Sequence, residues 1–420
     1  MNEILENLKD HESIPGLSDL VEQSHNNEET MINYLRRNQR SFDEEPFNPV
    51  DSLVLSSIVY LNFDAYAYGS PFGSSPIPLI DVIRFTEFKK LTAGSWMKDT
   101  DEVGDFLTAL CTSRRYKDLA VMFFANEISE HIEKQFSAAT FKLDDSRVYI
   151  AFRGTDGTLT GWKEDFNLGF KSVIPSQQTA CLYLSGVLSA LDSATDIIIG
   201  GHSKGGNLAE FAALCISETQ YDRITKIFNH DGPSFLQAPS PRIDSDEFQH
   251  KLHKTVPESS IFGLILENRD DFHVVQSTGT LVFQHNPVTW IVSGNDFLYQ
   301  ESLNKSAMLF DQTLDKWLKS CTKEQRECFI DTVFDLLTIN DAKNWDEYQD
   351  DLFGNIAAFV YNGAKLDKDT KEIILHTFGK LGNIANETVR RQLMKVFPWL
   401  KSLRDRTNRN DSALSEKNSD

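Results

Sequence analysis

The sequence predicts an α/β fold, and three observations carry that prediction. Helical and strand-like periodicities alternate from about residue 135 to about residue 295. Residues 196–200 (DIIIG) form a short, continuously apolar run, which is typical of a strand buried on both faces of a parallel sheet. A glycine-rich turn follows this run directly and leads into the apolar, helix-forming stretch NLAEFAALCI. Together these features favour a sheet with helices on both faces.

The elements of this core follow from local patterning in chain order. Two β-prone runs around the turn Asp-Asp-Ser predict a hairpin, leucines at helical spacing predict the first helix, and short apolar runs between turn residues predict the remaining strands. The predicted elements are a hairpin at 138–143 and 148–152, a helix at 178–194, a strand at 196–200, a helix at 208–216, a strand at 224–229, and a strand pair at 272–277 and 281–283.

Helical patterns flank the core on both sides. Upstream, PFNPVDSLVLSSIVYLNF starts at residue 46 with a Pro-Asp helix-start signal and continues with apolar residues at helical spacing. Amphipathic patterns predict further helices at 101–116 and 117–134, and downstream at 305–319, 323–338, 345–362, 368–380 and 385–400.

Composition divides the chain into four parts. We predict a polar helical lead-in at 1–45, an α/β domain with an N-terminal helical part at 46–300, a helical C-terminal region at 301–403, and a disordered tail at 404–420. The tail, RDRTNRNDSALSEKNSD, has too few apolar residues to form a core.

Charge and apolar content exclude several classes of function. Lys and Arg total 42 against 62 Asp and Glu, so the formal net charge is −20. A chain this acidic is repelled by phosphate backbones and anionic membranes, so we expect no nucleic-acid binding. Its apolar runs fall short of the roughly 20 residues that span a bilayer, so we expect no stable membrane insertion. The N-terminus lacks a basic segment followed by an apolar run, which predicts a cytoplasmic protein without a signal peptide.

The sequence shows no pattern of a metal or nucleotide site. Its five cysteines are scattered without a CxxC pair, and its acidic pairs lack the spacing of a calcium loop. Neither of the glycine-rich nucleotide-binding patterns is present. We therefore expect no metal and no cofactor.

The strongest chemical signal is GHSKG at residues 201–205, placed between a predicted strand and a predicted helix. G-x-S-x-G in this setting indicates a nucleophile elbow, in which a tight turn projects the serine hydroxyl away from the sheet. The flanking glycines are needed because a Cβ would collide with the neighbouring helix or strand. This makes Ser203 the candidate nucleophile. A glycine-rich turn with a bystander serine is the alternative.

A second signal lies upstream, where VYIAFRGT (148–155) predicts a buried strand that ends in Arg-Gly-Thr. In this arrangement the loop after an early strand supplies one donor of an oxyanion hole, and the residue after the nucleophile supplies the other. We therefore predict an oxyanion hole formed by Thr155, through its hydroxyl and backbone N–H, and by the backbone N–H of Lys204.

These motifs together resemble a known family. FRGT, then Trp162 and Asp165, then GHSKGGNLA resemble the class 3 (fungal-type) lipases of the α/β-hydrolase fold over residues 137–295. Lys204 stands where those enzymes usually have Leu. With NHDGPSF and QHNPVTW added, the chain looks more like the Mbeg1-like family of predicted bacterial hydrolases, over most of its length. The resemblance implies an α/β-hydrolase sheet and hydrolase chemistry, without a substrate.

A Ser–His–acid triad in this fold needs an acid and a histidine after the serine. His285 lies in a loop after the last predicted strand pair, which is also where the resemblance places the histidine. Asp231 follows the strand after the nucleophile helix, at the edge where catalytic loops gather. Glu258 lies nearer the usual position of the class 3 acid, so it stays an alternative, as does the pair at 270–271.

The leading hypothesis is a serine hydrolase of carboxylic esters, lipase- or esterase-like, that acts on a small-molecule or lipid ester. Ser203 attacks, His285 transfers the proton and Asp231 orients the imidazole. One alternative is a non-catalytic α/β-hydrolase scaffold whose helical C-terminal region binds a protein partner. Another is thioester or peptide hydrolysis by the same residues.

Overall fold

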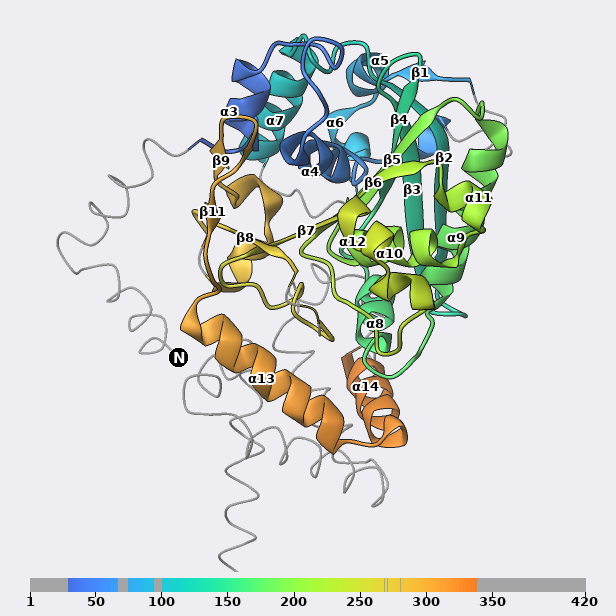
Figure 1. The fold of residues 1–420 in the computed structure, drawn as a ribbon, viewed down its shortest axis with the longest axis vertical. Coiled ribbons are helices and arrows are strands. Elements are labelled where there is room, and N and C mark those ends of the chain that lie inside the picture. Colours follow the sequence, from blue (N-terminus) through green and yellow to red (C-terminus); the bar gives the residue numbers. More distant parts are fainter. Residues whose placement is uncertain are drawn as a thin grey trace, which may run out of the picture.

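A nine-stranded sheet with helices on both faces organises the chain (Figure 1). The computed structural model describes residues 29–66, 75–93, 100–267, 269, 271–279 and 281–337. The strand order in the sheet is β1-β2-β3-β4-β5-β6-β7-β8-β11, so nearly every strand lies beside its neighbour in sequence. The predicted α/β fold class is confirmed.

The elements have the following bounds. The strands are β1 (Ile77–Pro78), β2 (Ala120–Ser129), β3 (Lys134–Lys142), β4 (Arg147–Phe152), β5 (Asp196–His202), β6 (Ile224–His230), β7 (Leu252–Pro257), β8 (His273–Val275), β9 (Val292–Ser293), β10 (Asp296–Phe297) and β11 (Tyr299–Gln300). The α-helices are α3 (Met31–Arg37), α4 (Pro49–Ile58), α5 (Leu79–Phe85), α6 (Phe88–Leu91), α7 (Thr100–Thr112), α8 (Leu159–Asn167), α9 (Pro175–Ala190), α10 (Lys204–Cys215), α11 (Glu218–Tyr221), α12 (Asp246–Lys251), α13 (Lys305–Ser320) and α14 (Lys323–Leu337).

The central strands are parallel. β4 pairs with β5, β5 with β6, β6 with β7 and β7 with β8 in parallel register, while β1 to β4 and the pair β8–β11 are antiparallel. The carboxyl ends of parallel strands meet at one edge, where loops from different parts of the chain converge. Ser203, Asp231 and Glu258 directly follow β5, β6 and β7, so all three lie at this edge.

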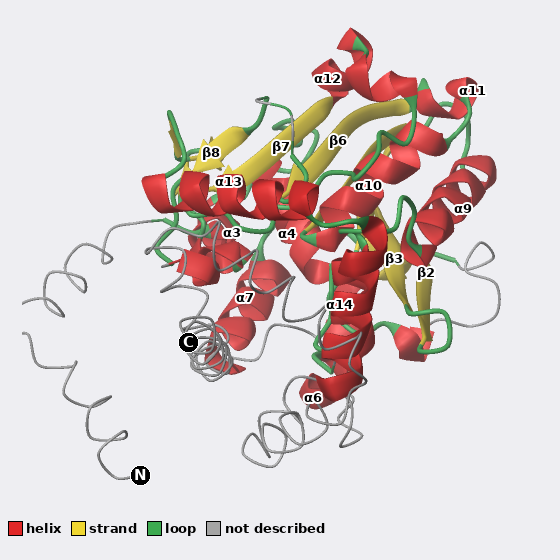
Figure 2. Cartoon of the chain, turned by 90° about the horizontal axis from the view of Figure 1, so that it is seen from below, coloured by secondary structure: helices red, strands yellow, loops and turns green. Residues whose placement is uncertain are grey.

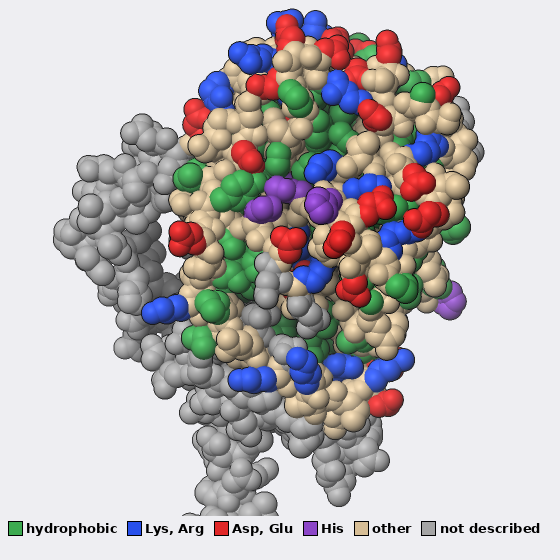
Figure 3. All heavy atoms as spheres, viewed as in Figure 1, with side chains coloured by type: hydrophobic (Ala, Val, Ile, Leu, Met, Phe, Trp, Pro, Cys, Tyr) green, Lys and Arg blue, Asp and Glu red, His purple; other side chains and the backbone are tan. Residues whose placement is uncertain are grey.

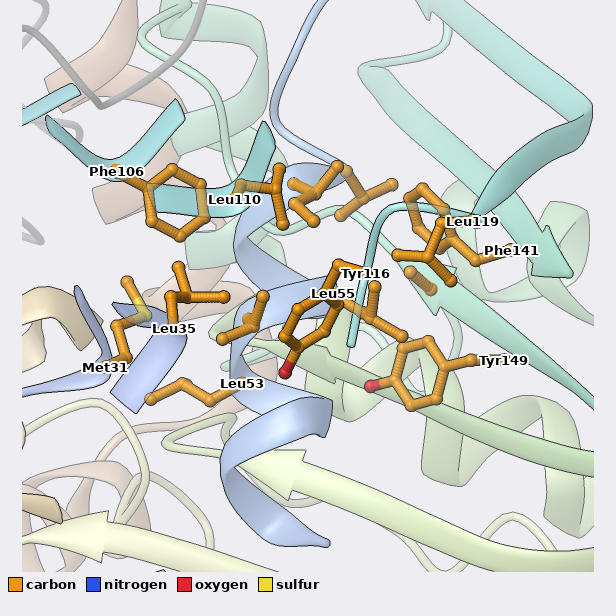
Figure 4. Packing of buried hydrophobic residues seen from close by; sticks show 14 of the residues in the cluster. Met31, Leu35, Leu53, Leu55, Phe106, Leu110, Tyr116, Leu119, Phe141 and Tyr149 are labelled. Carbon is orange, nitrogen blue, oxygen red and sulfur yellow. The ribbon is translucent and has the colours of Figure 1, made fainter. Parts of the chain in front are cut away.

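Alternate residues of the sheet belong to two separate apolar cores. Ile197 and Ile199 of β5 pack with α9 and α10, whereas Ile198 between them belongs to the cluster that contains α3, α4 and α7. Because successive side chains of a strand point to opposite faces, these helices cover opposite sides of the sheet, and Figure 2 shows the strands between helices. In the second cluster, side chains of α4 pack between those of α3, α7 and the strand residue Tyr149 (Figure 4).

Nine of the ten residues of α4 are buried, although its sequence is rich in polar residues. The Asn48 side chain caps the helix by accepting hydrogen bonds from the N–H groups of Val50 and Asp51. Asp51 is fully buried and is compensated by Arg115, whose Nη2 and Nε lie 2.5 and 2.8 Å from its carboxylate oxygens. The hydroxyls of two tyrosines donate to the same carboxylate. The Pro-Asp start signal of the sequence therefore begins a helix that is anchored by a buried ion pair.

Two sequence predictions of secondary structure are wrong. Residues 117–134 were expected to be helical, but most of them form β2, which pairs with β3. A register shift between Met122 and Ala125, with Phe123 at φ 52°, breaks the alternation that identifies a strand. Residues 281–283 were expected to be a strand, but they start a 3₁₀ turn (Leu281–His285), and the outer partner of β8 is β11.

β7 was not predicted at all. The alternation of apolar and polar residues that indicates a strand is interrupted, because the charged Lys254 occupies a buried position, where it is paired with Glu267. Burial of a lysine is tolerated when the charge is paired, but the sequence alone does not show the partner.

The first two predicted C-terminal helices are present as α13 and α14, and α14 packs against α8, as Figures 1 and 2 also show. The predicted helices at 345–362, 368–380 and 385–400 and the predicted tail at 404–420 lie outside the described residues, as does most of the predicted lead-in. None of the helices in the described part of the chain is long and apolar enough to cross a bilayer.

Removal of the Arg115 guanidinium tests how much the fold depends on this ion pair. Arg115→Met leaves the Asp51 charge buried without its counter-ion, so we expect a loss of about 3–5 kcal/mol in the free energy of unfolding. Arg114→Met is the matched control, because its ion pair with Glu44 is exposed on both sides and contributes about 0–1 kcal/mol. Urea denaturation measures both, and equal losses would contradict the assignment.

Candidate active site

Ser203 lies at the junction between β5 and α10, as the motif predicts. Its backbone has φ 57° and ψ −134°, a conformation that residues other than glycine rarely adopt. Two hydrogen bonds fix it, from the Ser203 N–H to His230 O (2.9 Å) and from the Gly206 N–H to Ser203 O (2.9 Å). The strained turn is therefore held by the end of β6 on one side and by the first turn of α10 on the other.

The glycines around Ser203 are required by close backbone contacts. A Cβ on Gly201 would lie 2.3 Å from the Gly205 carbonyl carbon, and a Cβ on Gly205 would lie 2.1 Å from Phe152 O. Gly154 is equally restricted, because a Cβ there would lie 2.0 Å from the Tyr60 hydroxyl and 3.2 Å from Ser203 Cβ. The Arg-Gly-Thr loop after β4 is thus packed directly against the elbow.

His285 and Asp231 are brought together from different loops. His285 Nδ1 lies 2.6 Å from Asp231 Oδ2. Because the carboxylate can only accept, Nδ1 carries the proton, and Nε2 is left with the lone pair that a base needs. His285 is partly exposed, whereas the Asp231 side chain is fully buried.

The carboxylate of Asp231 is itself held in place. Its Oδ1 accepts hydrogen bonds from Ser260 Oγ (2.5 Å) and from the Gly263 N–H (3.1 Å). Asp231 also has a positive φ of 55°, and its N–H donates to Thr255 O (2.7 Å), which fixes the turn after β6 to β7. Among the described non-glycine residues only five have positive φ, and two of them are Ser203 and Asp231.

The structure does not show every contact of a catalytic triad. No hydrogen bond joins Ser203 Oγ to the His285 ring within the described residues; such contacts are often long in unliganded enzymes and tighten when substrate binds. The alternative acid, Glu258, accepts instead from Gln284 Nε2 (3.1 Å) and has no hydrogen bond to His285 in the described part of the chain.

Two backbone donors next to Ser203 lack acceptors. Within the described chain, neither the Thr155 N–H nor the Lys204 N–H makes a hydrogen bond. The Thr155 hydroxyl, by contrast, donates to Asp165 Oδ2. The geometry therefore leaves the two predicted backbone groups available for an oxyanion, whereas the Thr155 hydroxyl, also predicted as a donor, already donates to a carboxylate.

The side chain of Lys204 was not anticipated as part of the site. It is 1% exposed, and its Nζ donates to Gln135 Oε1 (2.7 Å), Gln135 O (3.0 Å) and Glu164 Oε2 (3.0 Å). Only the departure from the usual Leu marked the position in the sequence, and no local pattern pointed to Gln135 or Glu164 as partners.

His202 and Tyr60 were also missed. His202 Nε2 lies 2.8 Å from His285 O, so it must donate to that carbonyl, and its Nδ1 lies 3.4 Å from the Tyr60 hydroxyl. Burial lowers the pKa of His202 well below its usual value, so the ring stays neutral. It fixes the backbone of His285 without adding charge to the site.

Burial raises the pKa of Asp165 to about 6, although the Lys204 ammonium and the hydrogen bond from Thr155 act in the opposite direction. Desolvation raises a carboxyl pKa because it penalises the charged form. The charge of Asp165 is therefore set close to neutral pH.

The histidines in the described part of the chain do not form a metal centre. His253 and His273 stack with ring centroids 4.6 Å apart, and Figure 3 shows histidine side chains gathered near the middle of one face, beside acidic and apolar ones. No group of three or more His, Cys, Asp or Glu residues that could hold a metal ion occurs among the described residues.

Comparison with known families adds to the geometry. The family described as Mbeg1-like matches residues 110–335, which is more than half of the chain and includes Ser203, Asp231 and His285. The chain belongs to the Mbeg1-like family. No curated protein matches it. Membership of the Mbeg1-like family is compatible with hydrolase chemistry and assigns no substrate, and α4 lies outside the matched range.

Substitution of Gly154 tests the close packing of the loop against the elbow. Gly154→Ala forces a Cβ against the Tyr60 hydroxyl and the His202 carbonyl oxygen, so we expect a loss of about 1–3 kcal/mol in the free energy of unfolding. Gly157→Ala, in the same loop, meets no atom within 4 Å and is the control. If urea denaturation finds the two variants equally stable, the described contact does not exist.

Proposed function

We propose that this protein is a serine hydrolase that cleaves carboxylic esters through an acyl-enzyme intermediate, with Ser203, His285 and Asp231 as its triad. The observation that carries the proposal is the joint placement at one sheet edge of a strained strand-to-helix serine and a buried Asp–His pair. Strained backbone and buried carboxylates are costly, and they gather at functional sites.

The hydrogen bonds support a role for each side chain. His285 Nε2 takes the proton as Ser203 Oγ attacks the ester carbonyl, and the same proton then passes to the leaving alcohol. Asp231 stabilises the imidazolium and holds the tautomer, because its Oδ2 accepts from Nδ1 while Ser260 and Gly263 hold its Oδ1. Water then hydrolyses the acyl-enzyme by the same proton transfers.

The negative charge of the tetrahedral intermediate needs preorganised donors. The N–H groups of Thr155 and Lys204 suit this role, since each is without an acceptor in the described chain and both flank Ser203. The N-terminus of α10, at Lys204, adds the positive end of a helix dipole. We assign the substrate to carboxylic esters of small molecules or lipids.

Labelling with a fluorophosphonate tests the nucleophile. Ser203 Oγ bonds to phosphorus, fluoride leaves, and His285 accepts the hydroxyl proton, so the wild type should be labelled and Ser203→Ala should not. The same pair is compared for turnover of p-nitrophenyl esters of graded chain length. If the folded wild type is neither labelled nor active on any ester, the chain is a non-catalytic scaffold and the proposal is wrong.

Asparagine substitution tests the acid. Asp231→Asn lets imidazole adopt the wrong tautomer, which costs about 10⁴ in turnover in the serine-protease template. We expect Asp231→Asn to be folded and nearly inactive and Glu258→Gln to keep most activity in the same ester assay. The reverse result would assign the acid to Glu258.

A further inference from the structure

The buried ammonium of Lys204 lies at an unfavourable place. Lys204 is the first residue of α10, where the helix dipole disfavours a cation, and its side chain is almost fully removed from water. An apolar residue of similar length would avoid both costs. The partners of Lys204 show what the charge acts on.

One set of contacts leads from Lys204 to the peptide bond that precedes Thr155. Lys204 Nζ donates to Gln135 Oε1 (2.7 Å), and this contact fixes which end of the Gln135 amide faces Gly154. Gln135 Nε2 then donates to Gly154 O (3.4 Å). Because the C=O and N–H of a trans peptide point in opposite directions, holding Gly154 O also sets the direction of the Thr155 N–H.

A second set of contacts leads to the Thr155 side chain. The Thr155 hydroxyl donates to Asp165 Oδ2, and Asp165 Oδ1 is buried without a hydrogen bond in the described chain but lies 3.8 Å from Lys204 Nζ. The Lys204 charge therefore favours the ionised form of Asp165, which is the form that accepts from Thr155.

Glu164 does not depend on Lys204 to the same extent. Its carboxylate also accepts from the Gln135 N–H (3.0 Å), the Ser176 N–H (2.9 Å) and Ser176 Oγ (2.7 Å). A buried carboxylate with three other donors is already well compensated. Within the described chain, Gln135 Oε1 and Asp165 Oδ1 have no polar partner other than Lys204 Nζ.

We propose that Lys204 is a positioning residue for the oxyanion hole, acting through Gln135 on the Gly154–Thr155 peptide and through Asp165 on the Thr155 hydroxyl. This inference rests on the proposed serine hydrolase function. The side chain of Lys204 would thus orient the donors of the oxyanion hole, whereas its backbone N–H is itself one of these donors.

Ester kinetics of Lys204→Met and Gln135→Met, alone and combined, test this role. Loss of one oxyanion donor costs about 10²–10³ in turnover, so we expect kcat to fall by about 10²-fold in each single variant while KM changes little. The affinity for a trifluoromethyl ketone, whose bound form carries an oxyanion, should fall in parallel. If Lys204 acts through Gln135, the kcat of the double variant should be no lower than the kcat of the less active single variant.

Lys134→Met is the matched control, since Lys134 is adjacent to Gln135 in β3 and pairs with Glu127 (2.5 Å) away from this cluster. It should leave kcat and ketone affinity unchanged. Gln135→Met keeps the Lys204–Glu164 pair, so it remains informative if Lys204→Met does not fold.

The outcomes separate this inference from the function on which it rests. If the wild type hydrolyses esters and folded Lys204→Met or Gln135→Met has the same kcat, the positioning role is wrong and the hydrolase proposal stands. Additive losses in the double variant overturn the route through Gln135. Absence of both fluorophosphonate labelling and ester turnover in the wild type overturns the function, and the positioning role with it.

Discussion

The close approach of α10 to β4 and β5 is the constraint on which the rest of the site depends. No side chain fits between Gly201, Gly205 and Phe152 O, so the helix begins immediately after the strand. This leaves Ser203 with a positive φ and, within the described chain, the buried Lys204 N–H at the start of α10 without an acceptor. The arrangement is costly for folding, and it is also what an attacking hydroxyl beside an oxyanion hole requires.

A polar layer beneath the sheet supports the same edge from the other face. Ser52 Oγ of α4 hydrogen-bonds to His230 Nε2 (2.9 Å), and His230 Nδ1 to Thr255 Oγ1 (2.7 Å), which couples the ends of β6 and β7. Tyr60, just after α4, contacts Gly154 and His202. A helix rich in serine can be fully buried because its serine hydroxyls hydrogen-bond to the helix backbone or to side chains of the sheet.

The sequence predicts those parts of the protein whose structure is determined by residues close together in the chain. DIIIG followed by GHSKG predicts the parallel strand, the turn and Ser203, because the apolar run and the steric need for glycine are both visible within ten residues. The positions of their loops after predicted strands favoured Asp231 and His285 over other candidates. In the structure, His285 Nδ1 lies 2.6 Å from Asp231 Oδ2. Their catalytic roles stay predictions.

What the sequence could not predict depends on contacts between distant segments. The sequence pattern of β7 does not indicate a strand, because Lys254 and Glu267 neutralise each other only after folding. The bulge in β2 interrupts the alternation that would identify it as a strand. The cluster around Lys204 is assembled from β3, α8 and α10, so no single stretch of sequence reveals it. Local patterns carry no information about such partners.

The sequential strand order has a consequence for how the chain folds. Each strand from β1 to β8 can add to an edge formed just before it, so the sheet can grow as the chain is synthesised. α4 is the exception, because one of its partners, His230, lies 178 residues after Ser52. Closing so long a loop is slow, and α4 leaves the ribosome well before β6. We therefore expect amides of α4 to gain protection from hydrogen exchange after those of β4 and β5.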